Sequence, residues 1–357
     1  MDDEDSLSPT TLRPDRTQRL ERVLAWMETH RLLMALLSFG VGAASFVFVA
    51  RAVRLAQWLA LLLVVAWLVL LIEGTLGRKL AHRRWWKLSP FVLRYATQSL
   101  HQETYFFCLP FLLATTIWSS GQALFTGLGI VAALCSMWDP IYYGWIGARP
   151  WAMLAYHAAS MYLAALVVPP LLWQLDTTRS LALASLIIGT LAVPSLLHLL
   201  KPRRAVQWTL LLAIAAGLAG ASWLGRRWVP PATLRTQRAL ITLSVDPDAR
   251  EPDTAVQTVT PDQLRQSGVC AFMSISAPRG LEEPIFHRWL FNGALQTTVP
   301  LAIAGGREQG YRVWSCKHGF PPDPRGRWRV EAVTDSGQLI GDVRFKVADP
   351  VTPAAGS

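Results

Sequence analysis

The sequence predicts two regions: a membrane all-α bundle of about seven transmembrane helices, followed by an all-β sandwich of immunoglobulin-like architecture. Three observations lead to this prediction. Of the 357 residues, 52% are hydrophobic and only 16% are charged, which is too apolar for an ordinary soluble protein. Long apolar runs fill the first 228 residues. Beyond residue 228 they give way to short segments with strand-like alternation.

Residues 1–31 form a charged head that opens with an acidic stretch and carries five arginines. Within residues 14–31, apolar side chains recur at helical spacing among charged ones. This pattern is typical of an amphipathic helix on the inner membrane surface, and equally of a solvated lead-in helix. We expect no cleavable signal peptide, because the first apolar run begins only at residue 32.

Seven apolar runs then occupy residues 32–228, each close to the length of about 17–25 residues that a helix needs to cross a bilayer. The runs cover residues 32–50, 55–72, 100–119, 122–138, 151–175, 181–200 and 208–224. Tryptophans lie near the ends of several runs, where an indole ring fits the headgroup level. Generic packing is the other explanation for these tryptophans.

The basic excess of the chain belongs to its membrane half. The net charge is +10, and residues 1–228 hold 20 Lys and Arg against 11 Asp and Glu, whereas the remainder holds 14 against 13. Fifteen of those 20 lie in the head and in alternate loops, so the positive-inside rule places the N-terminus in the cytoplasm. Because the number of spans is odd, we expect a membrane protein whose C-terminal domain lies outside the cytoplasm, with the lipid bilayer as a partner and no nucleic acid.

Residues 229–238, which contain a Pro-Pro pair, are expected to link the bundle to a periplasmic sandwich over residues 239–357. Asn292-Gly293 and Ser336-Gly337 are hairpin turn signals, because glycine adopts positive φ angles readily. Such short strands separated by turns favour an antiparallel sandwich. The candidate strands cover residues 239–245, 269–277, 285–291, 295–304, 311–316, 328–334 and 339–347.

The four cysteines divide between the two regions. Cys108 and Cys135 fall in predicted spans, whereas Cys270 and Cys316 fall on predicted strands of the outer domain. In an oxidising compartment, a disulfide between the last two would stabilise the domain by roughly 3–4 kcal/mol in the chain-entropy model. Two free buried thiols are the alternative.

Several short motifs in the outer domain carry a family resemblance. They are His-Arg-Trp at 287–289, Tyr-Arg-Val-Trp-Ser-Cys-Lys at 311–317, Gly-Arg-Trp-Arg-Val at 326–330, Asp-Ser-Gly-Gln-Leu-Ile-Gly at 335–341 and Phe-Lys-Val at 345–347. Over residues 269–347 the chain resembles an uncharacterised bacterial family whose β-domain often follows a multi-spanning membrane region. Tyr311 and Cys316 depart from its pattern. The resemblance implies a fold and a cellular location, but no activity.

Aromatic and basic side chains in this domain suggest two roles. Trp289, Trp314 and Trp328 lie on different predicted strands, where a place in the sandwich core is favoured over ligand binding. Lys317, Arg327 and Arg329 are candidates for a cationic surface that binds an anionic envelope component, either a protein or a glycan.

Polar residues inside predicted spans are candidate sites, because they are costly in lipid. The seven-span topology places His101, Glu103, Asp139 and His157 toward the cytoplasmic leaflet. Gathered in a bundle, these groups could bind a metal, relay protons or hold a polar headgroup. The alternative is that they simply reach the headgroup level.

None of the common nucleotide-binding, zinc-protease or hydrolase motifs occurs, so we expect no catalytic residue, no metal and no cofactor. The leading interpretation is a non-enzymatic inner-membrane protein that anchors a periplasmic interaction domain. The alternative is a membrane enzyme or transporter that works at the polar cluster. A sensor that passes an external signal inward is the third.

Overall fold

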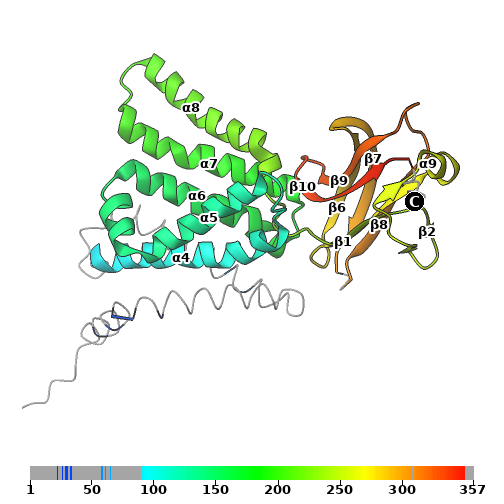
Figure 1. Cartoon of the computed structure of the whole chain (residues 1–357). Coiled ribbons are helices and arrows are strands. Elements are labelled where there is room, and N and C mark those ends of the chain that lie inside the picture. The colour runs from blue at the N-terminus through cyan, green and yellow to red at the C-terminus, as the bar shows by residue number, and fades with distance from the viewer. Residues whose placement is uncertain are drawn as a thin grey trace, which may run out of the picture.

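The computed structural model describes residues 90–349 except 307–308, together with eight isolated positions between residues 22 and 65. The expected head and the first two expected spans, residues 32–50 and 55–72, therefore lie outside the continuously described part. Figure 1 shows the described chain in two parts, a set of helices running side by side and a β-domain beyond one end of them.

Five long helices make up the first part. They are α4 (Pro90–Thr115), α5 (Gln122–Met137), α6 (Pro150–Trp173), α7 (Thr177–Leu200) and α8 (Ala205–Leu224). A π-helix, η1 (Pro140–Ile146), lies between α5 and α6, and a short 3-10 helix, η2 (Gly225–Trp228), follows α8. The helices correspond to the third to seventh apolar runs of the sequence.

Local sequence signals set the helix ends. α6 begins with Pro150 at a position where no intrahelical N–H bond is needed, and it ends at Gln174 in the left-handed conformation with φ 53°. The carboxylate of Asp176 then caps α7 by accepting a hydrogen bond of 2.7 Å from Arg179 N. α7 ends in the same way as α6, at Lys201 with φ 42°.

By length and composition, two of the described helices could cross a membrane, namely Pro150–Trp173 and Ala205–Trp228. A third would result if α5 and η1 are one span bent by 97°. The described helices therefore do not show about seven spans. α4 falls short because its first half is polar. In α7, the stretch whose side chains are continuously described, Thr177–Val193, is apolar but shorter than a full span. A helical N-terminal half is confirmed, and a seven-helix membrane bundle stays a prediction.

The second part is a β-domain of two main sheets. Its long strands are β1 (Arg235–Thr242), β5 (Val269–Ser276), β6 (Glu282–Phe291), β7 (Ala294–Ala304), β8 (Tyr311–Lys317), β9 (Gly326–Thr334) and β10 (Leu339–Val347). One sheet has the order β1-β5-β8 and the other β4-β10-β9-β6-β7, in which β4 is the short strand Thr258–Val259. The seven long strands agree with the seven that the sequence predicts, to within four residues at their ends.

Smaller elements of the β-domain escaped prediction. These are β2 (Val245–Asp246), β3 (Glu251–Pro252), β4 (Thr258–Val259) and helix α9 (Pro261–Ser267). β2 and β3 form a hairpin of their own, and β4 pairs in parallel with β10. A capping box between Thr260 and Gln263 starts α9. Strands of two residues give no periodicity that a sequence could reveal.

The inward faces of the two sheets form the core of the β-domain. Trp289 of β6 and Trp328 of β9 are fully buried there, and Phe345 of β10 packs against both rings. Trp314, also predicted for the core, lies outside it. Because Val313 points into the core and side chains alternate along a strand, Trp314 points to the outer face of the three-stranded sheet.

Candidate functional site

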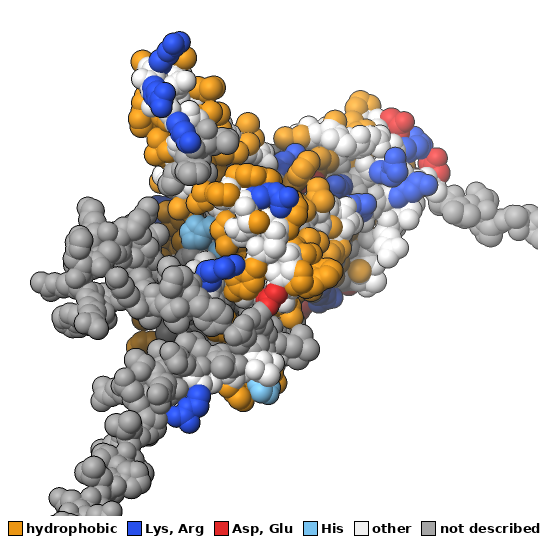
Figure 2. Space-filling model, turned by 90° about the vertical axis from the view of Figure 1, so that its left-hand side faces the viewer, with side chains coloured by type: hydrophobic (Ala, Val, Ile, Leu, Met, Phe, Trp, Pro, Cys, Tyr) orange, Lys and Arg blue, Asp and Glu red, His pale blue; other side chains and the backbone are white. Residues whose placement is uncertain are grey.

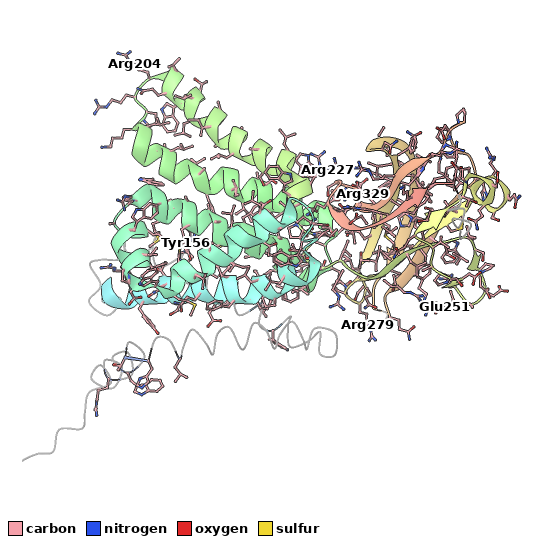
Figure 3. All side chains as sticks on the ribbon, in the orientation of Figure 1. Tyr156, Arg204, Arg227, Glu251, Arg279 and Arg329 are labelled. Carbon is pink, nitrogen blue, oxygen red and sulfur yellow. A yellow bond between two sulfur atoms is a disulfide. The ribbon has the colours of Figure 1, made fainter. Side chains whose placement is uncertain are left out.

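Several polar side chains of the helical half meet in the part of the bundle that lies away from the β-domain. His101 of α4 is fully buried, with Nδ1 2.7 Å from Tyr142 Oη on η1. Its ring centroid lies 5.6 Å from that of His157 and 5.1 Å from that of Tyr156, both on α6. Tyr156 is labelled in Figure 3 among these helices. The structure therefore brings His101 and His157 together.

The two carboxylates predicted for the same cluster behave differently. Asp139 Oδ1 accepts a hydrogen bond of 2.9 Å from Gln98 Nε2, and Gln98 lies one helical turn before His101. Glu103 is half-buried and follows His101 by two residues, which turns it about 200° around the helix. Asp139 therefore lies at the border of the cluster, whereas the side chain of Glu103 points away from it, from another side of α4. No group of three or more His, Cys, Asp or Glu that could hold a metal occurs among the described residues.

Sequence reasoning missed the side chains that close this cluster. Gln98 Nε2 and Gln102 Nε2 both donate to Ser136 O, at 3.0 and 2.7 Å, and Tyr156 Oη donates to Ala132 O at 2.5 Å. Ser136 lies in the last turn of α5, where intrahelical partners for the carbonyl groups run out. The polar side chains therefore satisfy the backbone at the sharp bend between α5 and η1. In the sequence, the signal for these side chains is the pair of amides at positions 98 and 102, one helical turn apart.

A buried carboxylate joins the two parts of the protein. Glu283 of β6 lies at the N-terminus of α7, where its Oε2 accepts hydrogen bonds from Thr177 N at 2.8 Å and Thr177 Oγ1 at 3.0 Å. The free N–H groups and dipole of a helix N-terminus suit a carboxylate. Burial nevertheless raises the pKa of Glu283 to about 7, against the opposing effect of the two bonds from Thr177. Glu283 was not among the candidate residues predicted from the sequence.

The β9–β10 hairpin also contacts the helical half. Ser336 N donates to Thr178 Oγ1 at 3.1 Å, and Ser336 O accepts from Arg226 Nε at 2.5 Å. Gln338 Nε2 donates to Val229 O at 3.1 Å. The Asp-Ser-Gly turn of the family-like motif is therefore a contact between the two parts of the protein.

A second polar group is buried inside the β-domain. His287 Nδ1 lies 2.9 Å from Ser315 Oγ, which also accepts a hydrogen bond of 3.1 Å from Trp289 Nε1. Because an indole N–H can only donate, the serine hydroxyl proton is available to His287 Nδ1. Burial lowers the pKa of His287 to about 4, so its ring is neutral at pH 7. These hydrogen bonds connect β6 to β8 across the core. They give the His-x-Trp pattern of residues 287–289 a structural explanation, because both side chains bind the same serine.

The expected cysteine pair faces each other across β5 and β8. Cys270 and Cys316 are register partners on these strands, and a disulfide joins their sulfur atoms. Cys108 and Cys135, both in helices, are free thiols.

The three residues of the predicted cationic surface do not lie together. Lys317 Nζ donates a hydrogen bond of 2.8 Å to Thr297 Oγ1 of β7, at the edge between the two sheets. Arg327 and Arg329 alternate with the buried Trp328, so they lie on the outer face of the five-stranded sheet.

The register adds two basic residues that the sequence analysis missed. Arg344 lies opposite Arg329, and Lys346 lies opposite Arg327. Their alternation with the buried Phe345 on β10 was the available signal.

Two family models match the chain. A family of unknown function, DUF5924, matches residues 14–271, and a protein family of unknown function, DUF2914, matches residues 282–347. No curated protein matches the chain. The first match extends from the helical half to the third residue of β5, and the second begins at β6, so the boundary between them falls inside the β-domain.

Proposed function

The chain belongs to the DUF5924 family of unknown function, and from that premise we propose that it is a multi-pass protein of the bacterial inner membrane. In this proposal the helical half anchors a periplasmic β-domain, which binds a component of the cell envelope. The observation that carries the proposal is the distribution of exposed aromatic and apolar side chains over the helices.

Large apolar side chains cover the outside of the helical half. On α5, Leu124, Leu128, Val131 and Leu134 are all more than half exposed. α8 presents a similar face, on which Leu224 is 76% exposed. Soluble proteins rarely expose continuous apolar surfaces of this extent, whereas a helix surrounded by lipid is expected to.

Exposed tryptophans mark both ends of this apolar surface. α6 carries Trp151 in its first turn and Trp173 at its end, 55% and 60% exposed. They lie about 33 Å apart along the helix, close to the roughly 30 Å of a bilayer core. Trp208 and Trp228 bracket α8 and η2 in the same way. Indole rings at two levels this far apart are typical of a membrane-spanning domain.

The distribution of charge favours a cytoplasmic location for the helix ends away from the β-domain. Figure 2 looks at these ends and shows Lys and Arg side chains on them. Arg149, Lys201, Arg203 and Arg204 belong to the turns there. At the opposite end, Arg227 contacts Glu331 of the β-domain at 3.5 Å. The positive-inside rule then supports a periplasmic β-domain, and so does the disulfide, which persists in an oxidising compartment.

The experiment that tests this proposal labels single cysteines with a membrane-impermeant maleimide on intact cells whose outer membrane admits the reagent. R265C is on α9 of the β-domain and R204C precedes α8, and both replace exposed arginines. C108A and C135A remove the free thiols. We expect R265C to react in intact cells and R204C to react only after lysis. The reverse result, or equal labelling, would overturn the proposal.

One observation favours a second candidate function, proton transport or catalysis at the polar cluster. The α5–η1 pair bends by 97° beside the imidazoles of His101 and His157, and broken helices often line transport sites. H157A should then reduce proton flux in proteoliposomes, while S160A on the same helix should not. Equal flux in the two variants and the wild type would exclude this candidate.

A further inference from the structure

The outer face of the five-stranded sheet gathers basic side chains in register. Arg344 pairs with Arg329, and Lys346 pairs with Arg327. We call this surface, together with two flanking arginines, the basic face. Its members are Arg227, Arg288, Arg327, Arg329, Arg344 and Lys346.

Two acidic residues lie within the same rows, and each already has two partners. Glu331 contacts Arg329 at 3.3 Å and Arg227 at 3.5 Å. Asp342 contacts Arg329 and Arg344, both at 3.0 Å. The two carboxylates therefore form ion pairs with three arginines, Arg227, Arg329 and Arg344, and the basic face keeps a net positive charge.

Three cations of the basic face make no such pairs. Within the described part of the chain, Arg288, Arg327 and Lys346 have no carboxylate within 4.0 Å. Along β9, Arg327 lies four residues before Glu331, so the face extends about 13 Å from the contact with Arg227. Its free cations are thus spread along a strip and could contact an extended anion.

Two guanidinium groups converge at the end of this strip nearest the helices. A Cβ built on Gly337 would lie 3.7 Å from Arg288 Nη2 and 3.9 Å from Arg226 Nε. Gly337 itself has φ +89°, a conformation that favours glycine, and it lies at the tip of the β9–β10 hairpin. Arginine recognises phosphate groups well because its planar group offers paired donors.

The basic face continues into the apolar surface of α8. Leu218, Ala221, Leu224 and Arg227 are all exposed along the second half of α8 and its extension η2. Figure 3 shows Arg227 and Arg329 near each other where the helices meet the β-domain. A strip of cations beside an exposed apolar helix matches an amphiphile with an anionic head.

We infer that this junction binds an anionic phospholipid. Its acyl chains lie along α8, and its phosphate lies on Arg226 and Arg288 beside Gly337. The rest of its headgroup extends toward Arg327. The inference deepens the proposed function and rests on it, because it requires the junction to lie at the outer surface of the inner membrane. It identifies the bound envelope component as a lipid of that membrane.

The test uses the full-length protein in a neutral detergent. Isothermal titration calorimetry compares dioctanoyl phosphatidylglycerol, dioctanoyl phosphatidylcholine and inorganic phosphate. Wild type should bind the glycerol lipid at least about tenfold more tightly than the choline lipid, which has the same chains but no net charge. R288Q/R327Q should weaken binding of the glycerol lipid about thirtyfold, since it removes two surface charges.

The matched control is R235Q/R265Q, which removes the same charge from β1 and α9 and should bind as the wild type does. Equal affinity for the two lipids, or full binding by R288Q/R327Q, would overturn the inference. Inorganic phosphate binding as tightly as the glycerol lipid would also overturn it, in favour of a soluble anion. If R265C is labelled in intact cells but the protein shows no lipid preference, only the inferred lipid site is wrong. If R265C is labelled only after lysis, both proposals are wrong.

Discussion

The helical half and the β-domain distribute apolar side chains in opposite ways. In the β-domain Trp289 and Trp328 are at most 1% exposed, and Leu295 is the single large hydrophobic side chain recorded as exposed among its described residues. In the helical half Leu128 on α5 is 62% exposed, while the polar His101 is fully buried. Both parts have well-packed interiors, so the difference concerns the surface. Under the proposed function, this difference means that the two surfaces face different solvents, lipid and water.

Loss of the disulfide should have the largest effect and should separate the two parts. Cys270 and Cys316 are 46 residues apart, so C270S/C316S should lower the free energy of unfolding of the β-domain by about 4 kcal/mol in the chain-entropy model. Pulse proteolysis in urea, scored by cleavage in each half, measures this. C135S in α5 is the control and should leave the β-domain unchanged. Equal destabilisation of both halves would show that they unfold as one unit.

A matched pair of leucines tests the difference in solvent directly. Leu128 on α5 and Leu295 on β7 are 62% and 57% exposed. L128R should cost about 3 kcal/mol for membrane insertion, whereas L295R should change stability by less than about 0.5 kcal/mol. The fraction of protein in the membrane pellet, and the melting temperature of what is purified, report the two effects. If both variants behave as the wild type does, the helical surface does not face lipid.

The contact between the two parts should depend on pH through Glu283. Its raised pKa means that the folded protein holds a proton that the unfolded chain releases, so this contribution to stability is full below about pH 4.5 and is lost as the pH rises through about 7. E283Q lacks this dependence. The free energy of unfolding of E283Q relative to wild type should therefore rise between pH 4.5 and 7 by at most about 3 kcal/mol.

Denaturant titrations at pH 5 and pH 8 measure this difference. E282Q, which changes the neighbouring exposed carboxylate, is the control and should follow the wild type. The opposite trend would mean that the Thr177 bonds outweigh burial. His287 contributes with the opposite sign, because its lowered pKa favours folding above about pH 6.5, but that contribution cancels in the comparison of E283Q with wild type.

The polar group inside the β-domain should show the smallest effect. S315A leaves His287 Nδ1 and Trp289 Nε1 without their partner, and this should destabilise the β-domain by about 1–3 kcal/mol. S267A on the exposed side of α9 should have almost no effect. Both values follow from denaturant unfolding of the full chain. A loss below about 0.5 kcal/mol for S315A would indicate that water replaces the hydroxyl.

The candidate sites were only partly predictable. His101 and His157 were chosen for the cost of burying polar groups in lipid, and their rings meet. Gln98 and Tyr142, which complete the cluster, looked like ordinary polar residues because nothing in a linear sequence shows which groups a helix bend leaves unsatisfied. The basic face was predicted through Arg327 and Arg329, but Lys317 lies at another edge, since its strand joins the other sheet.

The sequence by itself determined where the elements lie. Long apolar runs defined α4 to α8, and period-two segments defined the seven long strands, because burial of apolar surface acts through spacing along the chain. The order of the strands, the outward position of Trp314 and the contact of Glu283 with α7 were decided only by the tertiary structure. These features depend on which surfaces meet in space, and residues more than 100 positions apart carry no local signal of such contacts.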